Sequence, residues 1–287
     1  YPLIKTLRYG ENPHQKAFWY GLSNIGWNSA EQLQGKELSY NNLLDLDSAL
    51  STVLEFGYQE KDETSSNEFA AVILKHNNPC GASISNSVSQ AFLNALECDS
   101  VSAFGGIVAF NSNVDSKTAI SLKDIFLECV VAPSFDPEAL EILKIKKNLR
   151  ILKLSRDQLP KSNQTSTKSI MGGLLVQDSD DSEEKTESWI TVTKKNPSNQ
   201  TNLDLNFAWK ICKHVKSNAI VIAKDQKTIG IGAGQMNRVG AAKIALKEAG
   251  DLCSEAVLAS DGFFPFADTV ELASEYGIKA IVQPGGS

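Results

Sequence analysis

The stretch AAVILKHNNPCGAS (70–83) decides what kind of fold this chain can adopt. Its first half is a short, nearly continuous apolar run, the pattern of a strand that is buried on both faces of a sheet. Lysine and histidine end the run, and Pro79-Cys80-Gly81 then predicts a turn. Apolar residues recur at helical spacing over 88–96, with Ser85 or Asn86 available as the N-cap. The stretch therefore predicts a buried strand, a turn and a helix, the building unit of α/β proteins.

The same alternation continues along the chain. In the first half we predict strands at 105–111, 129–133 and 149–154, and helices at 118–128 and 137–147, the latter opened by Asp136-Pro137. In the second half we predict a helix at 203–215, two strands within 218–234 joined by Asp225-Gln226-Lys227, a helix that ends at Gly250, a helix from about Asp268 and a strand at 278–284. Both halves offer a strand, a glycine-containing turn and a helix. We therefore expect a duplicated α/β unit, although no residue-level repeat demonstrates it.

The composition changes between 155 and 203. Serine, asparagine, glutamine, threonine and acidic residues dominate there, around one apolar island, SIMGGLLVQ (169–177). Such a stretch is typical of a long irregular connection on the surface. We therefore predict a first lobe over 1–155, a polar connection over 156–203 and a second lobe over 204–287.

The overall composition is that of a soluble globular protein, with 42% hydrophobic and 22% charged residues among 287. The net charge of −6 argues against nucleic-acid binding, which normally needs a basic surface. Five scattered cysteines without a C-x-x-C pair argue against a disulfide framework and favour a reducing cytoplasm. No apolar stretch approaches the roughly 18 residues of a membrane helix, so no membrane contact is expected. The first residues show neither an initiator methionine nor a signal-peptide pattern, and we expect a piece of a longer polypeptide.

Pro79-Cys80 invites comparison with zinc-dependent deaminases. These enzymes need a glutamate in H-x-E and a second cysteine in P-C-x-x-C. Here position 83 is serine and asparagines follow His76, so both the ligand set and the acid are incomplete. We therefore expect no zinc and interpret Cys80 as a small buried residue beside the turn.

GIGAG (230–234) could be taken for a dinucleotide-binding loop. The complete fingerprint is G-x-G-x-x-G after the first strand of a βαβ unit. Neither the spacing nor the preceding hairpin fits this fingerprint. The favoured interpretation is that the glycines allow backbone to approach backbone or a ligand closely.

Lys75 and His76 are the first candidates for catalysis. They end a buried strand, and ligands of open α/β sheets gather beyond the carboxyl ends of the strands. Histidine can accept a proton from an amine nucleophile near neutral pH, and a lysine ammonium can neutralise a developing oxyanion. From the residues alone, a catalytic pair and a solvated strand end remain equally open.

Two further stretches are candidates for binding. In SDGFFPFAD (260–268), three phenylalanines and a proline predict either a core turn or a slab for a flat heteroaromatic ring, with Asp261 and Asp268 to accept hydrogen bonds from ring N–H groups. In LRYGENPHQ (7–15), Arg8 suits a phosphate or a carboxylate, which its planar fork can bind bidentately. A structural loop is the equal alternative for this second stretch.

Taken together, these stretches resemble the formyltransferase part of the AICAR transformylase/IMP cyclohydrolase family of bifunctional purine-biosynthesis enzymes. The motifs follow the family's order over nearly the whole chain: LRYGENPHQ (7–15), ELSYNNLLDLDSAL (37–50), KHNNPCGAS (75–83), SAFGGIVAFN (102–111), VVAPSFDPEAL (130–140), IMGGLLVQD (170–178), VKSNAIVIA (215–223), GIGAGQMNR (230–238) and SDGFFPFAD (260–268). The resemblance implies an α/β fold of two cytidine-deaminase-like three-layer lobes joined by a long polar connection. It also accounts for the Pro-Cys-Gly sequence without zinc.

The resemblance further implies a reaction and its residues. The 5-amino group of AICAR, the aminoimidazole carboxamide ribonucleotide, would attack the formyl carbon of 10-formyltetrahydrofolate. His76 would accept the proton of the amine, and Lys75 would stabilise the tetrahedral oxyanion or handle the proton. The family's AICAR contacts fall on Arg8, Tyr9, Asn42, Phe104, Gly105, Glu128, Asn218 and Arg238, and its folate contacts on Phe263, Pro265 and Asp268. The family often has a small residue such as alanine where Cys80 stands, which leaves the mechanism unchanged.

Members of the family are homodimers with active sites across the subunit interface, and we expect the same here, without a catalytic metal and with a structural monovalent cation near Asp261 left open. The cyclohydrolase part of the family precedes LRYGENPHQ, so we expect this chain to transfer a formyl group without closing the product to IMP, although its complete parent is expected to do both. The chain also ends at QPGGS, before a family segment that contributes a phosphate-binding arginine. Two rival functions stay open: a metal-dependent nucleoside or base deaminase, and a regulatory module that binds purine ribotides or folates.

Overall fold

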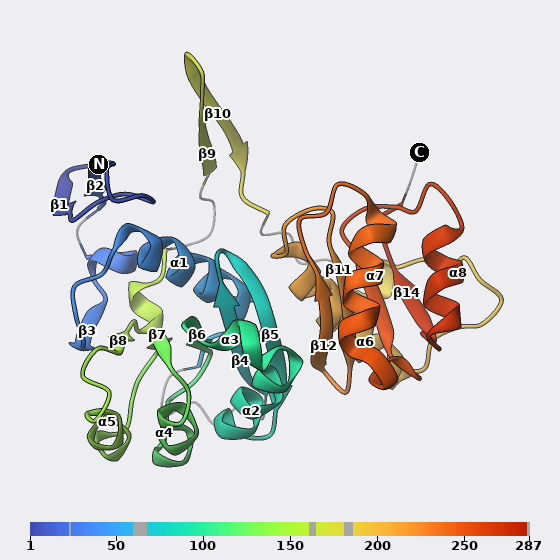
Figure 1. Cartoon of the computed structure of the whole chain (residues 1–287), viewed down its shortest axis with the longest axis horizontal. Helices are drawn as coiled ribbons and strands as arrows, with labels where there is room; N and C mark the ends of the chain where they lie inside the picture. Colours follow the sequence, from blue (N-terminus) through green and yellow to red (C-terminus); the bar gives the residue numbers. More distant parts are fainter. Residues whose placement is uncertain (23, 60–67, 161–164, 181–185, 286–287) are drawn as a thin grey trace.

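The apolar run forms the predicted buried strand. Strand β4 (Phe69–Lys75) has its five central residues buried, and it pairs antiparallel with β5 (Asn78–Ser85) on one side and β6 (Gly106–Phe110) on the other. The computed structural model describes residues 1–22, 24–59, 68–160, 165–180 and 186–285. Figure 1 shows β4 among its neighbours in the first half of the chain.

The turn after β4 is not the one that proline and glycine predicted. The chain reverses at His76-Asn77, where φ is 52° and 59°, and Pro79-Cys80-Gly81 lie inside strand β5. Because β5 continues to Ser85, the helix that follows starts later and has Ser87 as its N-cap in place of Ser85 or Asn86. The first unit is therefore a tight hairpin followed by a helix.

Ten strands of the described residues form one mixed sheet that runs through both halves of the chain (Figure 1). The order across the sheet is β14 (Ala280–Val282), β13 (Val257–Ser260), β11 (Ile220–Lys224), β12 (Lys227–Gly232), β5, β4, β6, β7 (Leu127–Ala132), β8 (Arg150–Lys153) and β3 (Glu31–Gln34). Strands β6, β7 and β8 run parallel, as do β13 and β14, and the other pairs are antiparallel.

Helices cover both faces of this sheet. On one face lie α1 (Tyr40–Leu54) and α6 (Asn199–Lys213), which share one hydrophobic core. The other face carries α2 (Val88–Cys98), α3 (Ser100–Ala103), α4 (Ser116–Lys123), α5 (Pro137–Leu143), α7 (Arg238–Ala249) and α8 (Asp268–Glu275), packed over two separate cores. The α/β class predicted from the sequence is therefore confirmed.

The two halves repeat one topology. Helix α1, hairpin β4–β5, helix α2 and strands β6 and β7 correspond in order to α6, β11–β12, α7, β13 and β14. Because β5 and β12 pair antiparallel at the junction, the second half is turned end over end relative to the first. Helix packing repeats as well: a Cβ on Gly81 would lie 1.9 Å from the carbonyl oxygen of Ala95, and one on Gly230 would lie 2.1 Å from that of Ala245. Gly230 of GIGAG thus serves backbone packing, as the sequence favoured.

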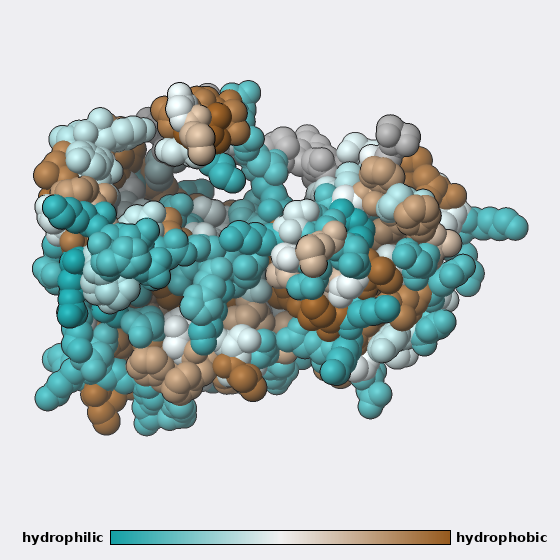
Figure 2. All heavy atoms as spheres, turned by 45° about the horizontal axis from the view of Figure 1, so that its top comes forward, coloured by the Kyte–Doolittle hydropathy of each residue, from teal (hydrophilic) through white to brown (hydrophobic). Residues whose placement is uncertain are grey.

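The polar connection is not irregular throughout. Its described part contains an antiparallel hairpin, β9 (Thr165–Ile170) and β10 (Gly173–Asp178), whose residues are all exposed. This hairpin projects from the body of the molecule in Figure 1, and Figure 2 shows apolar side chains gathered on it. Residues 161–164 and 181–185, which include the middle of the acidic run, lie outside the described residues.

Several boundaries differ from the prediction. Helices α4 and α5 end earlier than expected, at Lys123 and Leu143, because the chain needs the following residues to enter β7 and β8. Helix α6 starts at Asn199, with Ser198 as its N-cap. Strand β3 and the hairpin of β1 (Leu3–Leu7) and β2 (Ala17–Tyr20) were not predicted. Short 3₁₀ helices cover Gly26–Asn28, Arg156–Gln158, Thr186–Ser188 and Gly250–Cys253. Among the described residues, no helix combines the length and the apolar character that crossing a membrane requires.

Candidate active site

Strand registers bring most of the predicted site residues to one edge of the sheet. In the first half, β4 ends at this edge and β5, β6, β7 and β8 begin there. In the second half, which is turned end over end, β12 and β13 end there and β11 begins there. We call this the site edge and define it by residues within two positions of these strand ends: Lys75, Gly105, Glu128, Arg150, Asn218 and Asp261.

Lys75 lies against the loop that enters β6. Its Nζ donates a hydrogen bond of 2.6 Å to the carbonyl oxygen of Phe104, and the exposed Phe104 ring packs on Phe126 with centroids 5.1 Å apart. Gly105 follows with a φ of 74°, a left-handed conformation that favours glycine. The structure thus brings together Lys75, which the resemblance assigned to catalysis, and Phe104 and Gly105, which it assigned to AICAR binding.

His76 occupies the tight turn after Lys75 and is exposed. It lies beside Asp45 of α1, whose Oδ1 accepts a hydrogen bond of 2.8 Å from the backbone N–H of Asn77. The imidazole of His76 is therefore presented by a turn that α1 supports. Among the described residues, no side chain forms a hydrogen bond with that imidazole.

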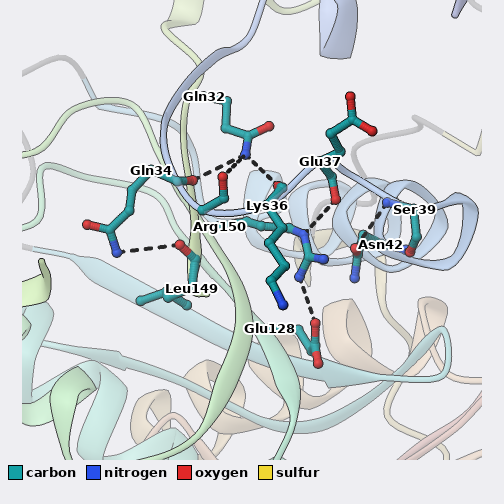
Figure 3. A network of polar contacts seen from close by, with 10 residues as sticks. Gln32, Gln34, Lys36, Glu37, Ser39, Asn42, Glu128, Leu149 and Arg150 are labelled. Carbon is teal, nitrogen blue, oxygen red and sulfur yellow. Dashed lines mark hydrogen bonds and ion pairs between the residues drawn. The ribbon is translucent and has the colours of Figure 1, made fainter. Parts of the chain in front are cut away.

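Glu128, at the start of β7, is held by an arginine that the sequence did not single out. Arg150 Nη1 donates to Glu128 Oε2 at 2.7 Å, and Arg150 Nε donates to the carbonyl oxygen of Glu37 at 3.0 Å (Figure 3). Glu37 lies two residues before Ser39, the N-cap of α1, where Ser39 and Asn42 form a capping box. One guanidinium thus links Glu128 to the segment just before α1, the helix whose first turn contains Asn42.

Arg238 and Asp261 form an ion pair in the second half of the site edge. Arg238 Nη1 also donates to Ser260 Oγ at 3.1 Å, and the Ala219 amide donates to Asp261 Oδ1 at 2.9 Å. Burial alone would raise the pKa of Asp261, but hydrogen bonds from the Ser217 hydroxyl, the Ala219 amide and the guanidinium outweigh it, and the pKa is lowered. The lowered pKa favours the ionised carboxylate, which together with Ser260 holds the Arg238 guanidinium in one orientation.

The two halves touch at this edge. Asn78 Oδ1, just after the His76-Asn77 turn, accepts a hydrogen bond of 3.0 Å from the backbone N–H of Lys216. Two residues further on, Asn218 Nδ2 donates to the carbonyl oxygen of Gln235 at 2.8 Å. The described contacts do not bring Asn218 or Arg238 of the same chain against the Lys75 and His76 side chains.

The SDGFFPFAD stretch forms a loop between β13 and α8. Phe264 packs against the second-half core, and its N–H donates to Gln283 Oε1 at 2.6 Å. Phe263 and Phe266 are exposed, as are Pro265 and Asp268. The three rings of the predicted slab therefore do not form one surface: Phe264 packs against the core, and Phe263 and Phe266 are exposed.

Arg8 and Tyr9 follow β1 in the N-terminal hairpin. The Arg8 guanidinium carbon lies 5.6 Å from the centroid of the Tyr9 ring. An ion pair of 2.8 Å between Lys5 and Glu37 ties the hairpin to the loop before α1. Arg8 and Tyr9 are thereby tethered near the Glu37–Arg150–Glu128 network, although neither contacts it.

Cys80 has the character of a structural thiol. Burial raises its pKa to about 12, so it keeps its proton at neutral pH and is a poor metal ligand. Within the described ranges, histidine, cysteine and acidic side chains do not assemble into groups that could hold a metal ion. All five cysteines are free. Cys80 lies in β5 rather than beside a turn, which corrects that part of its interpretation.

A cavity of about 610 Å³ opens next to the site edge, at the junction of the two halves. Asn78, Lys247, Asp99 and Glu248 are among its lining residues. Burial raises the pKa of Glu248, and the charge of Asp99 and a hydrogen bond to it raise that pKa further, against a hydrogen bond from the Ile231 amide. The pKa of Glu248 is therefore raised at the place where α7 meets the N-cap of α3 across the junction.

Arg150 and Asp45 are the two residues of this region that sequence reasoning missed. Each left a signal: Arg150 is a charged residue inside the apolar stretch LRILKL, and Asp45 stands between the apolar positions of an amphipathic helix. A charge in such a place is normally paired. Its partner, however, is set by strand register and helix packing.

Comparison with known proteins adds independent evidence. The chain matches the family model described as AICARFT/IMPCHase bienzyme over residues 1–248. Over its full length it is 89% identical to the bifunctional purine biosynthesis protein PurH of Prochlorococcus marinus strain MIT 9312, of which it covers 56%. The proteins of the same name from strains AS9601 and MIT 9211 are 88% and 60% identical to it. Each match includes the whole of this chain and covers 56% and 55% of the relative, respectively. The chain thus spans about half the length of the curated relatives it matches, and it belongs to the AICARFT/IMPCHase bienzyme family.

Proposed function

We propose that this chain transfers a formyl group from 10-formyltetrahydrofolate to the 5-amino group of AICAR in purine biosynthesis. The observation that carries the proposal is the family match over 1–248, which includes Lys75 and the His76-Asn77 turn. The relatives are named bifunctional purine biosynthesis proteins, a name that supports a purine precursor as substrate. The formyl-transfer activity is favoured because the motifs from LRYGENPHQ to SDGFFPFAD resemble that part of the family.

In the proposed reaction, the amine nitrogen of AICAR bonds to the formyl carbon, and the bond from that carbon to N10 of the folate breaks. His76 accepts the amine proton and returns a proton to N10, so tetrahydrofolate leaves. Lys75 Nζ, which donates to Phe104, neutralises the oxyanion of the tetrahedral intermediate. The amine is a poor nucleophile because its lone pair delocalises toward the carboxamide, so orientation supplies much of the rate.

The remaining parts of the proposal follow the same resemblance. AICAR is bound by Arg8, Tyr9, Asn42, Phe104, Gly105, Glu128, Asn218 and Arg238, and the folate ring by Phe263, Pro265 and Asp268. The lobes at 1–155 and 204–287 are of the cytidine-deaminase type. The protein acts in the cytoplasm without a catalytic metal, and a monovalent cation near Asp261 stays a prediction.

We also propose a homodimer with active sites across the interface. Two observations support it. Hairpin β9–β10 carries exposed apolar side chains, and in the described part of the chain the contacts of Asn218 and Arg238 are with residues other than Lys75 and His76. A second copy can supply the missing half of each site.

The test is a formyl-transfer assay on a polypeptide that carries this chain with the flanking parts of its relatives. His76→Ala should lower kcat by about 10²–10⁴-fold while the Kd for AICAR changes little. The matched control is His214→Gln, because His214 pairs with Glu55 at 2.9 Å and is not among the residues assigned to catalysis or binding. An unchanged kcat in His76→Ala contradicts the general-base role. Binding of AICAR by the wild type without turnover favours a regulatory module instead.

A further inference from the structure

The turn that carries His76 has an unusual backbone. Both of its central residues, His76 and Asn77, are left-handed although neither is glycine, with φ values of 52° and 59°. Two-residue hairpin turns of this kind normally use Asn-Gly, because a left-handed conformation costs an L-residue roughly 1–2 kcal/mol. Such a turn persists only when the surrounding structure holds it.

One turn of α1 supplies that support. Asp45 Oδ1 accepts the backbone N–H of Asn77 at 2.8 Å, and the backbone of His76 also donates to this carboxyl group. The Asn77 side chain lies 3.2 Å from Ser48 Oγ, and with its amide group reversed it also donates to the carbonyl oxygen of Leu44 at 3.1 Å. Burial raises the pKa of Asp45, and the hydrogen bonds from Asn77 and His76 and the charge of His76 offset this only in part.

The second half of the chain contains the same device without a histidine. There the turn between β11 and β12 is Asp225-Gln226, with φ values of 53° at both residues. Asp204 of α6, which is 1% exposed, accepts the backbone N–H of Gln226 at 2.9 Å. Asp45 and Asp204 therefore occupy equivalent positions in the two halves, and each accepts a backbone N–H from the second residue of its turn. They differ in what their turns present: His76 at the site edge, and an acidic residue at the opposite edge.

We propose that Asp45 is a positioning residue for the reaction: by fixing the His76-Asn77 turn to α1, it sets the direction in which the His76 imidazole meets the substrate. This inference rests on the proposed formyl transfer. Asp45 touches no reacting atom, and it acts through the backbone of the turn and through its negative charge beside the imidazole. The charge also stabilises the imidazolium that forms when His76 has accepted a proton.

Three single variants test the inference in the formyl-transfer assay. Asp45→Ala removes the acceptor and should lower kcat by about 10- to 100-fold, with the Kd for AICAR unchanged within about threefold. Asp45→Asn keeps an oxygen that can accept the Asn77 N–H, and it should recover most of the lost kcat. Asp204→Ala removes the matching bond in the second half. It should lower the unfolding midpoint and leave kcat unchanged, because its turn carries no reacting group.

A double variant separates positioning from general damage. In the absence of His76, Asp45→Ala should cause no further loss of kcat, since the two residues act as a unit. Additive losses overturn the inference, as do equal losses of kcat in Asp45→Ala and Asp204→Ala. Hydrogen exchange of the Asn77 amide should be faster in Asp45→Ala whether or not the enzyme turns over. If Asp45→Ala does not fold, Ser48→Ala is the milder variant, because it removes a contact to the Asn77 side chain. It should lower kcat to a smaller extent, and an unchanged kcat there overturns the inference.

The outcome also distinguishes this inference from the function on which it rests. A His76→Ala variant with unchanged kcat contradicts the proposed general base, and the positioning role falls with it. A His76→Ala variant with low kcat, beside an Asp45→Ala variant with normal kcat, overturns only the role of Asp45.

Discussion

Arg150 Nη1 donates a hydrogen bond of 2.7 Å to Glu128 Oε2 across two neighbouring parallel strands. The arginine side chain is 13% exposed and the glutamate 39%, so the pair lies at the border between core and solvent. The second hydrogen bond of the guanidinium, to the carbonyl oxygen of Glu37, ties the start of α1 to the same place. A candidate AICAR ligand, Glu128, is thereby held by a residue that need not contact the substrate.

Arg150→Met should lower the free energy of unfolding by about 1–3 kcal/mol, because it leaves Glu128 and the Glu37 carbonyl oxygen without their donor. It should also weaken AICAR binding, since Glu128 loses its fixed direction. Urea unfolding and calorimetric titration with AICAR measure the two effects. The control is Lys153→Met on the same strand, whose ion pair with Glu31 is longer, at 3.6 Å, and exposed on both sides. Such a pair is worth about 0–1 kcal/mol, so equal losses in the two variants would contradict this account.

Asp261 should make the protein sensitive to acid. Its folded-state pKa is lowered, so its ionised form stabilises the fold at every pH above the unfolded value. That stability is lost as the pH falls through the lowered folded value. The difference in unfolding free energy between the wild type and Asp261→Asn should therefore be constant from neutral pH down to about pH 4, near the pKa of an unfolded aspartate, and shrink below it. Urea unfolding between pH 7 and pH 2.5 measures this difference. If the difference in unfolding free energy increased in acid, the pKa of Asp261 would not be lowered in the folded protein.

The sequence predicted the elements whose signal is local. Strand β4 was predicted because residues 70–74 form an apolar run, and helix α7 ends at Ala249, directly before the predicted capping residue Gly250. The turn at His76-Asn77 was not predicted, since glycine and proline normally mark turns and here three residues of α1 stabilise a turn without them. Hairpin β9–β10 was missed because its residues are all exposed, which removes the alternation that marks a strand.

Long-range geometry, which a sequence pattern does not show, determines the candidate site even more than the fold. Lys75 and His76 were identifiable at the end of a predicted strand, and Lys75 does reach the loop at Phe104. Arg150 and Glu128 are separated by 22 positions, and their contact exists only because β7 and β8 pair in one register. The position of Asn218 on the same edge as Lys75 follows from the end-over-end repeat, which no single motif reveals.

Glu248 should have the opposite pH dependence to Asp261. Its folded-state pKa is raised, by burial first and by Asp99 next, so the folded protein binds a proton that the unfolded chain releases. Stability is then lost as the pH rises from the unfolded pKa through the raised folded value. Glu248→Gln can still accept the Ile231 N–H and donate to Asp99. It should therefore gain thermal stability over the wild type as the pH rises from about 4.5 to 8, measured by the unfolding midpoint. If the unfolding midpoint of the wild type exceeded that of Glu248→Gln by more at pH 8 than at pH 4.5, Glu248 would not share a proton with Asp99.

Hairpin β9–β10 should be a contact between two copies of the protein. Leu174 and Val176 lie on one face of β10, opposite Ser169 and Thr167 of β9, and both are largely exposed. Burying each such side chain contributes about 1.5–3 kcal/mol, and a two-fold interface counts each contribution twice. Replacing both by serine should therefore raise the dimer dissociation constant by at least about a thousandfold.

Light scattering over a range of protein concentrations measures this change, with Lys168→Ala on the other face of the hairpin as the control. The secondary structure of the monomer should be unaffected, because strands β9 and β10 form a sheet of their own, separate from the main sheet. Formyl transfer should fall in parallel with dimer content, since each site is proposed to use Lys75 and His76 from one copy and Arg238 from the other. A dimer that survives the double replacement would place the interface elsewhere, and an active monomer would show that one chain builds a complete site.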